Sequence, residues 1–526
     1  MKGADLFSKR LGPGALLLLV ILWLAGTVWV RPLSLPDEGR YVGVAWEMLR
    51  SGHWLVPTLD GLPYFHKPPL FYWITATSLS WFGAHEWAAR AAPLLGALAG
   101  AFALYRFTRR RAGEPSARLA LLVLATQPMF FVGAQFANLD MLVAGCIAVT
   151  ILACAHAILQ AQQGQPFRWA LALAFLFAAL GLLAKGLIGA VLPALVILAW
   201  LLALRRPRLL LPLLSLPGVA LFLVVAAPWF VAMQSRFPEF ANYFFVVQHF
   251  KRFAESGFNN VQPFYFYPVV LAVLTLPWFA WLPVAARRRY WSDPQQGAVR
   301  QLMWLWLAVV TLFFSLPQSK LIGYILPVAF PLAYLIGDSA AMVLASAPRA
   351  RRLWRITAAV AAATCLAAIA AGTVYSDKSL RDLARTLASR AAPQDTIVFL
   401  NDYYFDVPFY AGLREPVQVV EDWNDPRILQ RDNWKKELFD AKQFSPASAR
   451  PVLLPPASLP QILCSAPVIW VVGHSKNVGR YPELSHATEI ARHGETLLLR
   501  VPGRSPASLS AAGCPETPSA NSTDRL

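Results

Sequence analysis

The stretch LGPGALLLLVILWLAGTVWV, residues 11–30, decides the fold class of this chain because it holds no charged side chain. About 20 apolar residues in a helix are enough to cross the roughly 30 Å hydrocarbon core of a bilayer. The stretch follows Lys2, Lys9 and Arg10, as the core of a cleaved signal peptide would. No small-residue cleavage site precedes Arg31 and further apolar runs follow, so we interpret it as a first membrane span.

The rest of the chain repeats this apolar pattern. Of all residues 57% are apolar and 14% are charged, and the mean hydropathy is +0.46. These values predict a polytopic α-helical membrane protein with about eleven spans, or up to thirteen if the short fifth run is divided differently. The expected spans are residues 11–30, 88–105, 119–136, 141–159, 169–184, 186–204, 209–232, 264–286, 301–316, 321–342 and 356–374.

Basic residues set the expected orientation. The net charge is +18, and most Lys and Arg of the membrane part fall in alternate connections such as RFTRRR and APRARRLWR. Such connections usually face the cytoplasm, so we expect a cytoplasmic N-terminus and an outer C-terminus. The excess of positive charge is then explained by loops facing anionic lipid, and it does not indicate a nucleic-acid partner.

Composition changes near residue 375. From there on, 17 Lys and Arg stand against 17 Asp and Glu. We therefore predict a membrane domain over 1–374 with an outer loop at 31–87, a small periplasmic α/β domain over 375–503, and a polar tail over 504–526. Only Cys464 and Cys514 lie where an oxidising compartment would reach them, and whether they pair stays open.

Polar motifs gather on one predicted face of the membrane, the outer one. They include LSLPDEGRY (33–41), YFHKPP (64–69), NLD (138–140), AKG (184–186), QHFKRF (248–253) and QSKLIGY (318–324). Each has a structural alternative: Lys185 and Lys320 as snorkelling side chains, Asp37 and Asp140 as helix caps, and His249 as an interfacial histidine. Their collection on the face that usually carries fewer cations favours a functional site.

In this order the motifs resemble the bacterial aminoarabinose transferase family, polyprenyl-phosphate-dependent glycosyltransferases related to the protein O-mannosyltransferases. The resemblance covers residues 11–335 and includes EMLRSGHWLVPTLDGLPYFHKPPLFYW, NLD, AKG and SKLIGYILP. It implies a GT-C fold and a sugar donor carried on undecaprenyl phosphate or a similar lipid. It also implies a reaction centre at Asp37 and Asp140. The residues implied for the donor phosphate are Arg40, Lys67 and Tyr324, with Lys185, Arg252 and Lys320 as further candidates.

The chemistry requires such a set. Displacement at the anomeric carbon, with inversion, leaves a lipid phosphate of growing negative charge, which preorganised cations stabilise. Asp37 would act as general base toward an acceptor hydroxyl. If the acceptor is itself a phosphate, as on lipid A, no base is needed, and Asp37 and Asp140 would orient the reactants.

One residue departs from the family pattern. His66 stands where relatives often have Glu in YFEKP, and in relatives that Glu and the histidine matching His249 can hold a metal. Two histidines are good zinc ligands but form an incomplete site. The expected reaction requires no cofactor, and a divalent metal such as zinc stays open as an alternative.

Three functions compete. The first is a glycosyltransferase of the bacterial inner membrane that moves a sugar from undecaprenyl phosphate to lipid A or another envelope glycan on the periplasmic face. The second uses the same donor and a protein Ser or Thr acceptor. The third, a transporter of polyprenyl-linked sugars, is disfavoured because no charged residue falls mid-span and no internal repeat is seen.

Overall fold

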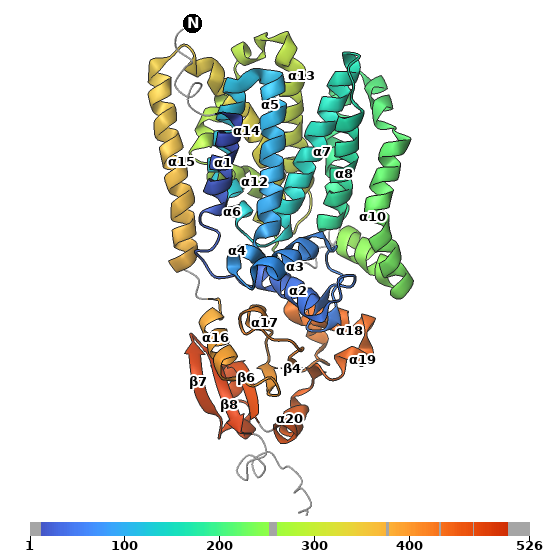
Figure 1. The fold of residues 1–526 in the computed structure, drawn as a ribbon, viewed down its shortest axis with the longest axis vertical. Helices are drawn as coiled ribbons and strands as arrows, with labels where there is room; N and C mark the ends of the chain where they lie inside the picture. The colour runs from blue at the N-terminus through green and yellow to red at the C-terminus, as the bar shows by residue number, and fades with distance from the viewer. Residues whose placement is uncertain (1–11, 252–259, 375–377, 431–432, 467, 503–526) are drawn as a thin grey trace, which may run out of the picture. The chain divides into compact units, whose positions relative to one another are not determined.

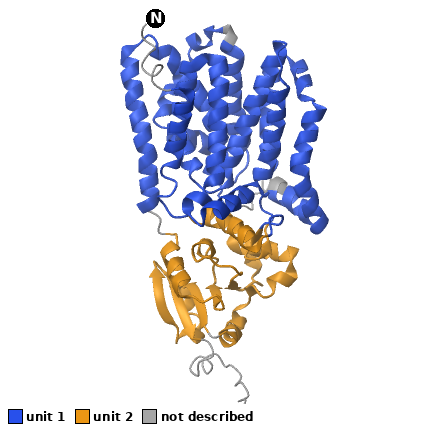
Figure 2. Ribbon diagram, in the orientation of Figure 1, with its two compact units in different colours: residues 1–33, 53–57, 65–376 blue, residues 34–52, 58–64, 377–526 orange. Residues whose placement is uncertain are grey.

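The computed structural model describes residues 12–251, 260–374, 378–430, 433–466 and 468–502, without the side chains of 249–251, 294 and 295. The chain divides into two compact units (Figure 2). Unit 1 comprises residues 1–33, 53–57 and 65–376, and unit 2 comprises residues 34–52, 58–64 and 377–526.

Unit 1 is a bundle of helices (Figure 1). Its first half contains α1 (Pro13–Ala25), α3 (Leu70–Phe82), α4 (Glu86–Ala89), α5 (Ala91–Thr126), α6 (Pro128–Ala134), α7 (Leu139–Gln162), α8 (Arg168–Lys185), α9 (Ile188–Ala203), η1 (Pro207–Leu213) and α10 (Leu216–Arg236). Its second half contains η2 (Asn242–Lys251), α12 (Phe266–Leu274), η3 (Trp278–Ala286), η4 (Arg288–Ser292), α13 (Pro294–Ser315), η5 (Ile322–Val328), α14 (Ala329–Leu344) and α15 (Pro348–Val374).

Seven helices among the described residues are long and apolar enough to cross a membrane, or eight if the pair α12 and η3, bent by 112°, counts as one span. The chain is therefore a polytopic helical membrane protein. The other expected spans take different forms. Helices α1 and α9 have 13 and 16 residues, shorter than a full crossing. The runs 88–105 and 119–136 share α5, which is broken at Gly113, where φ is 87° and Pro115 follows.

Small residues allow the central helices of unit 1 to pack closely. Gly96 of α5 and Gly145 of α7 bring the two backbones into contact, and a Cβ on Gly145 would collide with the carbonyl of Gly96. Such small-residue contacts drive helix association in membranes. Helix α10 turns Leu216, Val224 and Val231 outward, at 83%, 71% and 65% exposure, as expected of a surface that meets lipid.

Unit 2 contains a six-stranded sheet of order β5-β4-β3-β6-β8-β7. Strands β5 (Leu453–Leu454), β4 (Gln418–Val420), β3 (Thr396–Leu400) and β6 (Val468–His474) are parallel, whereas β8 (Thr496–Pro502) and β7 (Thr488–His493) are antiparallel. Val398 of β3 lies opposite Val471 of β6 in the core.

The remaining elements of the C-terminal segment are short. They are α16 (Arg381–Arg390), α17 (Val407–Tyr410), η6 (Pro426–Gln430), α18 (Trp434–Phe444), α19 (Pro446–Ala449), η7 (Pro456–Ser458), α20 (Leu459–Ser465), α21 (Ser475–Val478) and η8 (Pro482–Leu484).

Part of the predicted outer loop belongs to unit 2. Helix α2 (Asp37–Ser51) and the hairpin of β1 (Thr58–Leu59) and β2 (Leu62–Pro63) pack with the C-terminal segment. The Trp46 indole donates to the carbonyl of Leu413 at 3.0 Å, and Asp60 Oδ1 accepts from the Val417 amide at 2.9 Å. This corrects the predicted boundary, which placed residues 31–87 wholly with the membrane domain. Contacts far apart in the sequence leave no local pattern that would have shown it.

Candidate functional site

Three of the predicted motifs of unit 1 meet at Asp140. Asp140 is the second residue of α7, and Lys185 is the last residue of α8. The Lys185 ammonium forms an ion pair with Asp140 Oδ1 and lies 4.4 Å from the centre of the Tyr324 ring. Both charged side chains are only 10% exposed. We call Asp140, Lys185 and Tyr324 the membrane-unit cluster.

Backbone geometry explains the glycine of the LIGY motif. Gly323 lies against the Asp140 carboxylate, so a Cβ at this position would collide with Oδ2. The neighbouring Asn138 donates from Nδ2 to the same Oδ2 at 3.0 Å. Both oxygens of Asp140 therefore have partners, and the carboxylate is fixed in one orientation.

Two of the structural alternatives can be judged here. The residue that caps α7 is Asn138, whose Oδ1 accepts from the Asp140 amide at 3.0 Å, so Asp140 is not the cap. Lys185 pairs with Asp140 and is largely buried, which does not fit a side chain that snorkels to water.

Three further predicted residues, Lys320, Lys67 and Arg252, belong to the unit 1 part of the sequence. The Lys320 ammonium donates to the carbonyls of Gln262 and Pro317, at 2.9 and 2.5 Å, and so joins two loop segments. Lys67 is half-buried in a bend before α3. Arg252 lies outside the described residues. The structure thus groups Lys185 and Tyr324 with Asp140, whereas Lys320 bonds to backbone.

Of the two histidines considered as metal ligands, His66 is the one whose side chain is described. His66 is buried, and its Nε2 lies 2.7 Å from the Tyr243 hydroxyl, which accepts from the Gln248 amide at 3.0 Å. The side chain of His249 is outside the described part of the chain. Among described residues no group of three or more His, Cys, Asp and Glu side chains is placed to hold a metal. No chemical step is assigned to a metal.

In unit 2, the LPDEGRY motif runs into α2, and its last five residues form the first turn of this helix. Asp37 is the first residue of this helix, and Arg40 reaches back to pair with Asp37 Oδ1 through Nη2. The Nη1 of Arg40 pairs with Oε1 of Glu437 on α18. Burial disfavours the charge of Arg40, but Glu437, with smaller contributions from Tyr41, Tyr64 and Asp37, raises the pKa of Arg40 well above its usual value.

Glu437 is a residue that the motif analysis missed. Its Oε2 accepts from the Tyr64 hydroxyl at 3.2 Å, so each carboxylate oxygen has a partner. The sequence held one local signal. In NWKKELFDA, the helical period that places Trp434, Leu438 and Ala441 on one face also places Glu437 on that face. A charged residue on an apolar helix face is uncommon unless it is paired.

Comparisons with known proteins show which proteins this chain resembles. A family model described as dolichyl-phosphate-mannose-protein mannosyltransferase matches residues 66–231. The undecaprenyl phosphate-alpha-4-amino-4-deoxy-L-arabinose arabinosyl transferase of Pseudomonas aeruginosa (strain LESB58) is 34% identical over 321 residues, 60% of this chain and 58% of the relative. The chain is a relative of the aminoarabinose transferases. The enzyme of the same name from Pectobacterium carotovorum (strain PC1) is 33% identical over 349 residues, 64% of this chain and 61% of the relative.

The solved structures show the fold. The crystal structure of ArnT from Cupriavidus metallidurans bound to undecaprenyl phosphate has a TM-score of 0.77 and 23% identity, over 92% of this chain and 97% of that chain. This chain therefore shares the fold of that protein, the GT-C fold. Its alignments with the two curated enzymes span less than two thirds of the length of either enzyme.

Proposed function

We propose that this protein is an inverting glycosyltransferase that moves a sugar from undecaprenyl phosphate to lipid A or another envelope glycan. The observation that carries the proposal is the membrane-unit cluster, in which a buried carboxylate, an ammonium and a phenol from three motifs converge. A cation held in a place of low water content stabilises the charge that develops on a phosphate leaving group. The names of the relatives supply the donor and the sugar class.

Roles follow from the chemistry of each side chain. Lys185, Lys67 and Arg40 are the proposed cations for the donor phosphate, with Tyr324 as a hydrogen-bond donor. Asp37 is the proposed base for an acceptor hydroxyl, or the orienting group if the acceptor is a phosphate. Asp140 holds Lys185 in place through their ion pair. Arg252 and Lys320 remain proposed phosphate contacts of lower priority.

The proposed topology has eleven crossings, a cytoplasmic N-terminus and a periplasmic C-terminal α/β domain in the inner membrane. It counts α1, α9, the bent pair and each arm of α5 as crossings. The larger share of basic residues in the inner connections supports this orientation.

The test uses the purified full-length chain in lipid nanodiscs with undecaprenyl phosphate-aminoarabinose. Lipid A and a Ser- and Thr-rich peptide are offered as acceptors, and both are weighed by mass spectrometry. A pentosamine added to lipid A is the expected product. Because the matching family model is described by a protein mannosyltransferase, sugar on the peptide alone would establish protein O-glycosylation instead. Lipid A of unchanged mass would exclude lipid A as the acceptor, and unchanged masses of all envelope glycans offered in its place would overturn the proposal.

A further inference from the structure

We infer that Glu437, in the C-terminal α/β segment, is a positioning residue for the proposed reaction: it holds Arg40 and, through Arg40, the carboxylate of Asp37. The inference rests on the proposed function for the role of Asp37. The contacts that carry it lie within unit 2 and join residues 397 positions apart in the chain.

The three side chains linked by these contacts differ in their exposure to solvent. The Glu437 side chain is 6% exposed, Arg40 is 16% exposed and Asp37 is 39% exposed. The buried end is therefore an anchor, and the accessible end is the carboxylate that would meet a substrate. One guanidinium serves two carboxylates, so losing either one changes how it is held.

Aromatic side chains confine Arg40 between these partners. Its guanidinium carbon lies 5.2 Å from the Tyr41 ring centre and 5.8 Å from that of Phe405, distances typical of cation–π contacts. Gly39 packs so closely that a Cβ there would lie 3.1 Å from Cβ of Phe405. The first turn of α2 is thus seated against residues of the C-terminal segment.

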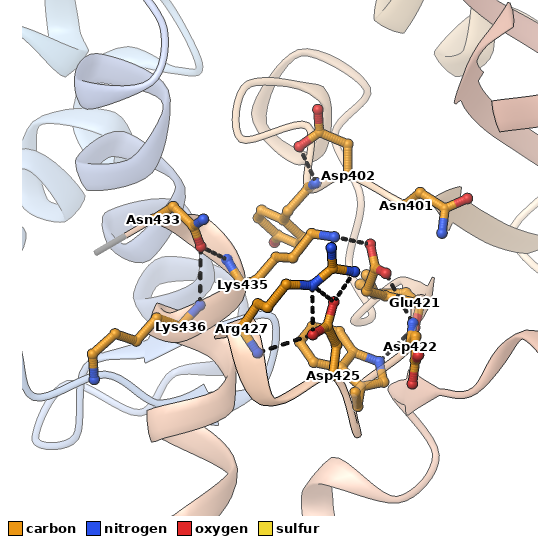
Figure 3. A network of polar contacts seen from close by, with 12 residues as sticks. Asn401, Asp402, Glu421, Asp422, Asp425, Arg427, Asn433, Lys435 and Lys436 are labelled. Carbon is orange, nitrogen blue, oxygen red and sulfur yellow. Dashed lines mark hydrogen bonds and ion pairs between the residues drawn. The ribbon is translucent and has the colours of Figure 1, made fainter. Parts of the chain in front are cut away.

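Glu437 lies on α18, and Figure 3 shows the polar contacts of Asn433 and Lys435 at the start of this helix. The cap of α18 is Asn433, whose Oδ1 accepts from the amides of Lys435 and Lys436 at 3.1 and 3.3 Å. The Lys435 ammonium pairs with Glu421, at the end of β4, at 2.6 Å. Because α18 is tied to the sheet, Glu437 offers Arg40 a fixed reference point.

The first measurement is steady-state transfer by Glu437→Gln, which keeps the shape and removes the charge. Misplacing a reacting group costs up to about a hundredfold in rate, so we expect kcat to fall by about tenfold to a hundredfold. Glu437→Asp, which keeps the charge and shortens its reach, should recover part of the loss. The matched control is Glu489→Gln, which removes a carboxylate from an exposed ion pair of the same unit and should leave kcat unchanged.

A double-mutant cycle separates positioning from a general structural role. If Glu437 acts through Arg40, then Glu437→Gln should cause no further loss of kcat in an Arg40→Gln background. Independent, multiplying losses would overturn the inference. So would a Glu437→Gln variant with the activity of Glu489→Gln.

Hydrogen exchange without substrates keeps the inference testable whatever the enzyme transfers. Peptides covering residues 37–51 should exchange faster in Glu437→Gln than in Glu489→Gln, and equal exchange would overturn the inference. A wild-type protein that transfers no aminoarabinose would instead defeat the proposed function, and the exchange comparison would still decide whether Glu437 holds α2.

Discussion

Lys185 forms an ion pair with Asp140, 45 residues earlier in the chain, and each side chain is nine-tenths buried. An ion pair at such depth contributes modestly to stability when intact, whereas removing one partner leaves a buried charge uncompensated. Stability and catalysis can therefore be separated at this pair.

We expect Lys185→Met to abolish transfer and to destabilise the protein by about 3 to 5 kcal/mol, because Asp140 loses its counter-ion. Adding Asp140→Asn should restore much of the stability, since no charge is left buried, but should not restore transfer. Thermal unfolding in detergent and initial transfer rates measure the two effects. Recovery of activity in the double variant would show that the pair is structural.

Asp37→Asn should remove transfer to a hydroxyl acceptor while leaving membrane insertion and donor binding intact. The amide keeps the shape of the side chain but cannot take a proton, a role typically worth 10² to 10⁴ in rate. Turnover and the affinity for undecaprenyl phosphate are measured side by side with Glu489→Gln. Turnover at the wild-type rate would remove Asp37 from the mechanism, and loss of folding would point to a helix-terminal role.

Lys67→Ala should weaken donor binding and slow transfer together. Lys67 precedes two prolines, which hold the backbone extended and limit where the ammonium can point. Loss of a charge-assisted contact of about 1.5 to 3 kcal/mol corresponds to roughly a tenfold to hundredfold effect.

Lys67→Arg should recover only part of this loss, because a guanidinium differs from an ammonium in reach and hydration. Binding of undecaprenyl phosphate is compared with Lys476→Ala, which alters an exposed lysine of unit 2. Unchanged donor affinity in Lys67→Ala would exclude the phosphate contact.

The β1–β2 hairpin should loosen as pH rises. Burial raises the pKa of Glu47 to about 7, although the amides of Gly61 and Asp60 donate to it. The folded protein thus keeps a proton that the unfolded chain releases near pH 4.5. Stability from this group is present below about pH 4.5 and is lost as pH rises towards 7.

Hydrogen exchange of residues 58–64, corrected for intrinsic rates, measures this effect between pH 5 and pH 8. Glu47→Gln should show a smaller pH dependence than the wild type. Some dependence should remain, because burial, reinforced by the nearby Glu47, also raises the pKa of Asp60 in the wild type. Equal dependence in the two proteins would mean that Glu47 does not titrate in this range.

Topology is checked by reporter fusions. A tag after Arg110 should report the cytoplasm, and one after residue 502 should report the periplasm, because basic connections stay inside. A cytoplasmic C-terminus would place the polar motifs on the opposite face from the one proposed.

Local patterns predicted local features well. Apolar runs locate α7 and α14, and the short apolar run APVIWVV locates β6. The sequence could predict that Asp140 and Lys185 lie on the same face of the membrane, because the assignment of spans places both helix ends there. The contact of Arg40 with Glu437 was not, because pairing over such a separation leaves no periodic trace. The break at Gly113 was likewise hidden, as hydropathy reports where a run is interrupted but not how the backbone turns there.

The make-up of unit 2 also constrains how the protein is made. Glu437, the partner of Arg40, is synthesised 397 residues later in the chain. At about 5 to 20 residues per second, a ribosome needs roughly 20 to 80 s to produce the intervening segment. During that time α2 has been synthesised, but α18, which it contacts in the folded protein, has not. A nascent chain that stalls before residue 437 therefore carries the LPDEGRY motif without the carboxylate that pairs with Arg40, so the protein completes this group of residues only late in its own synthesis.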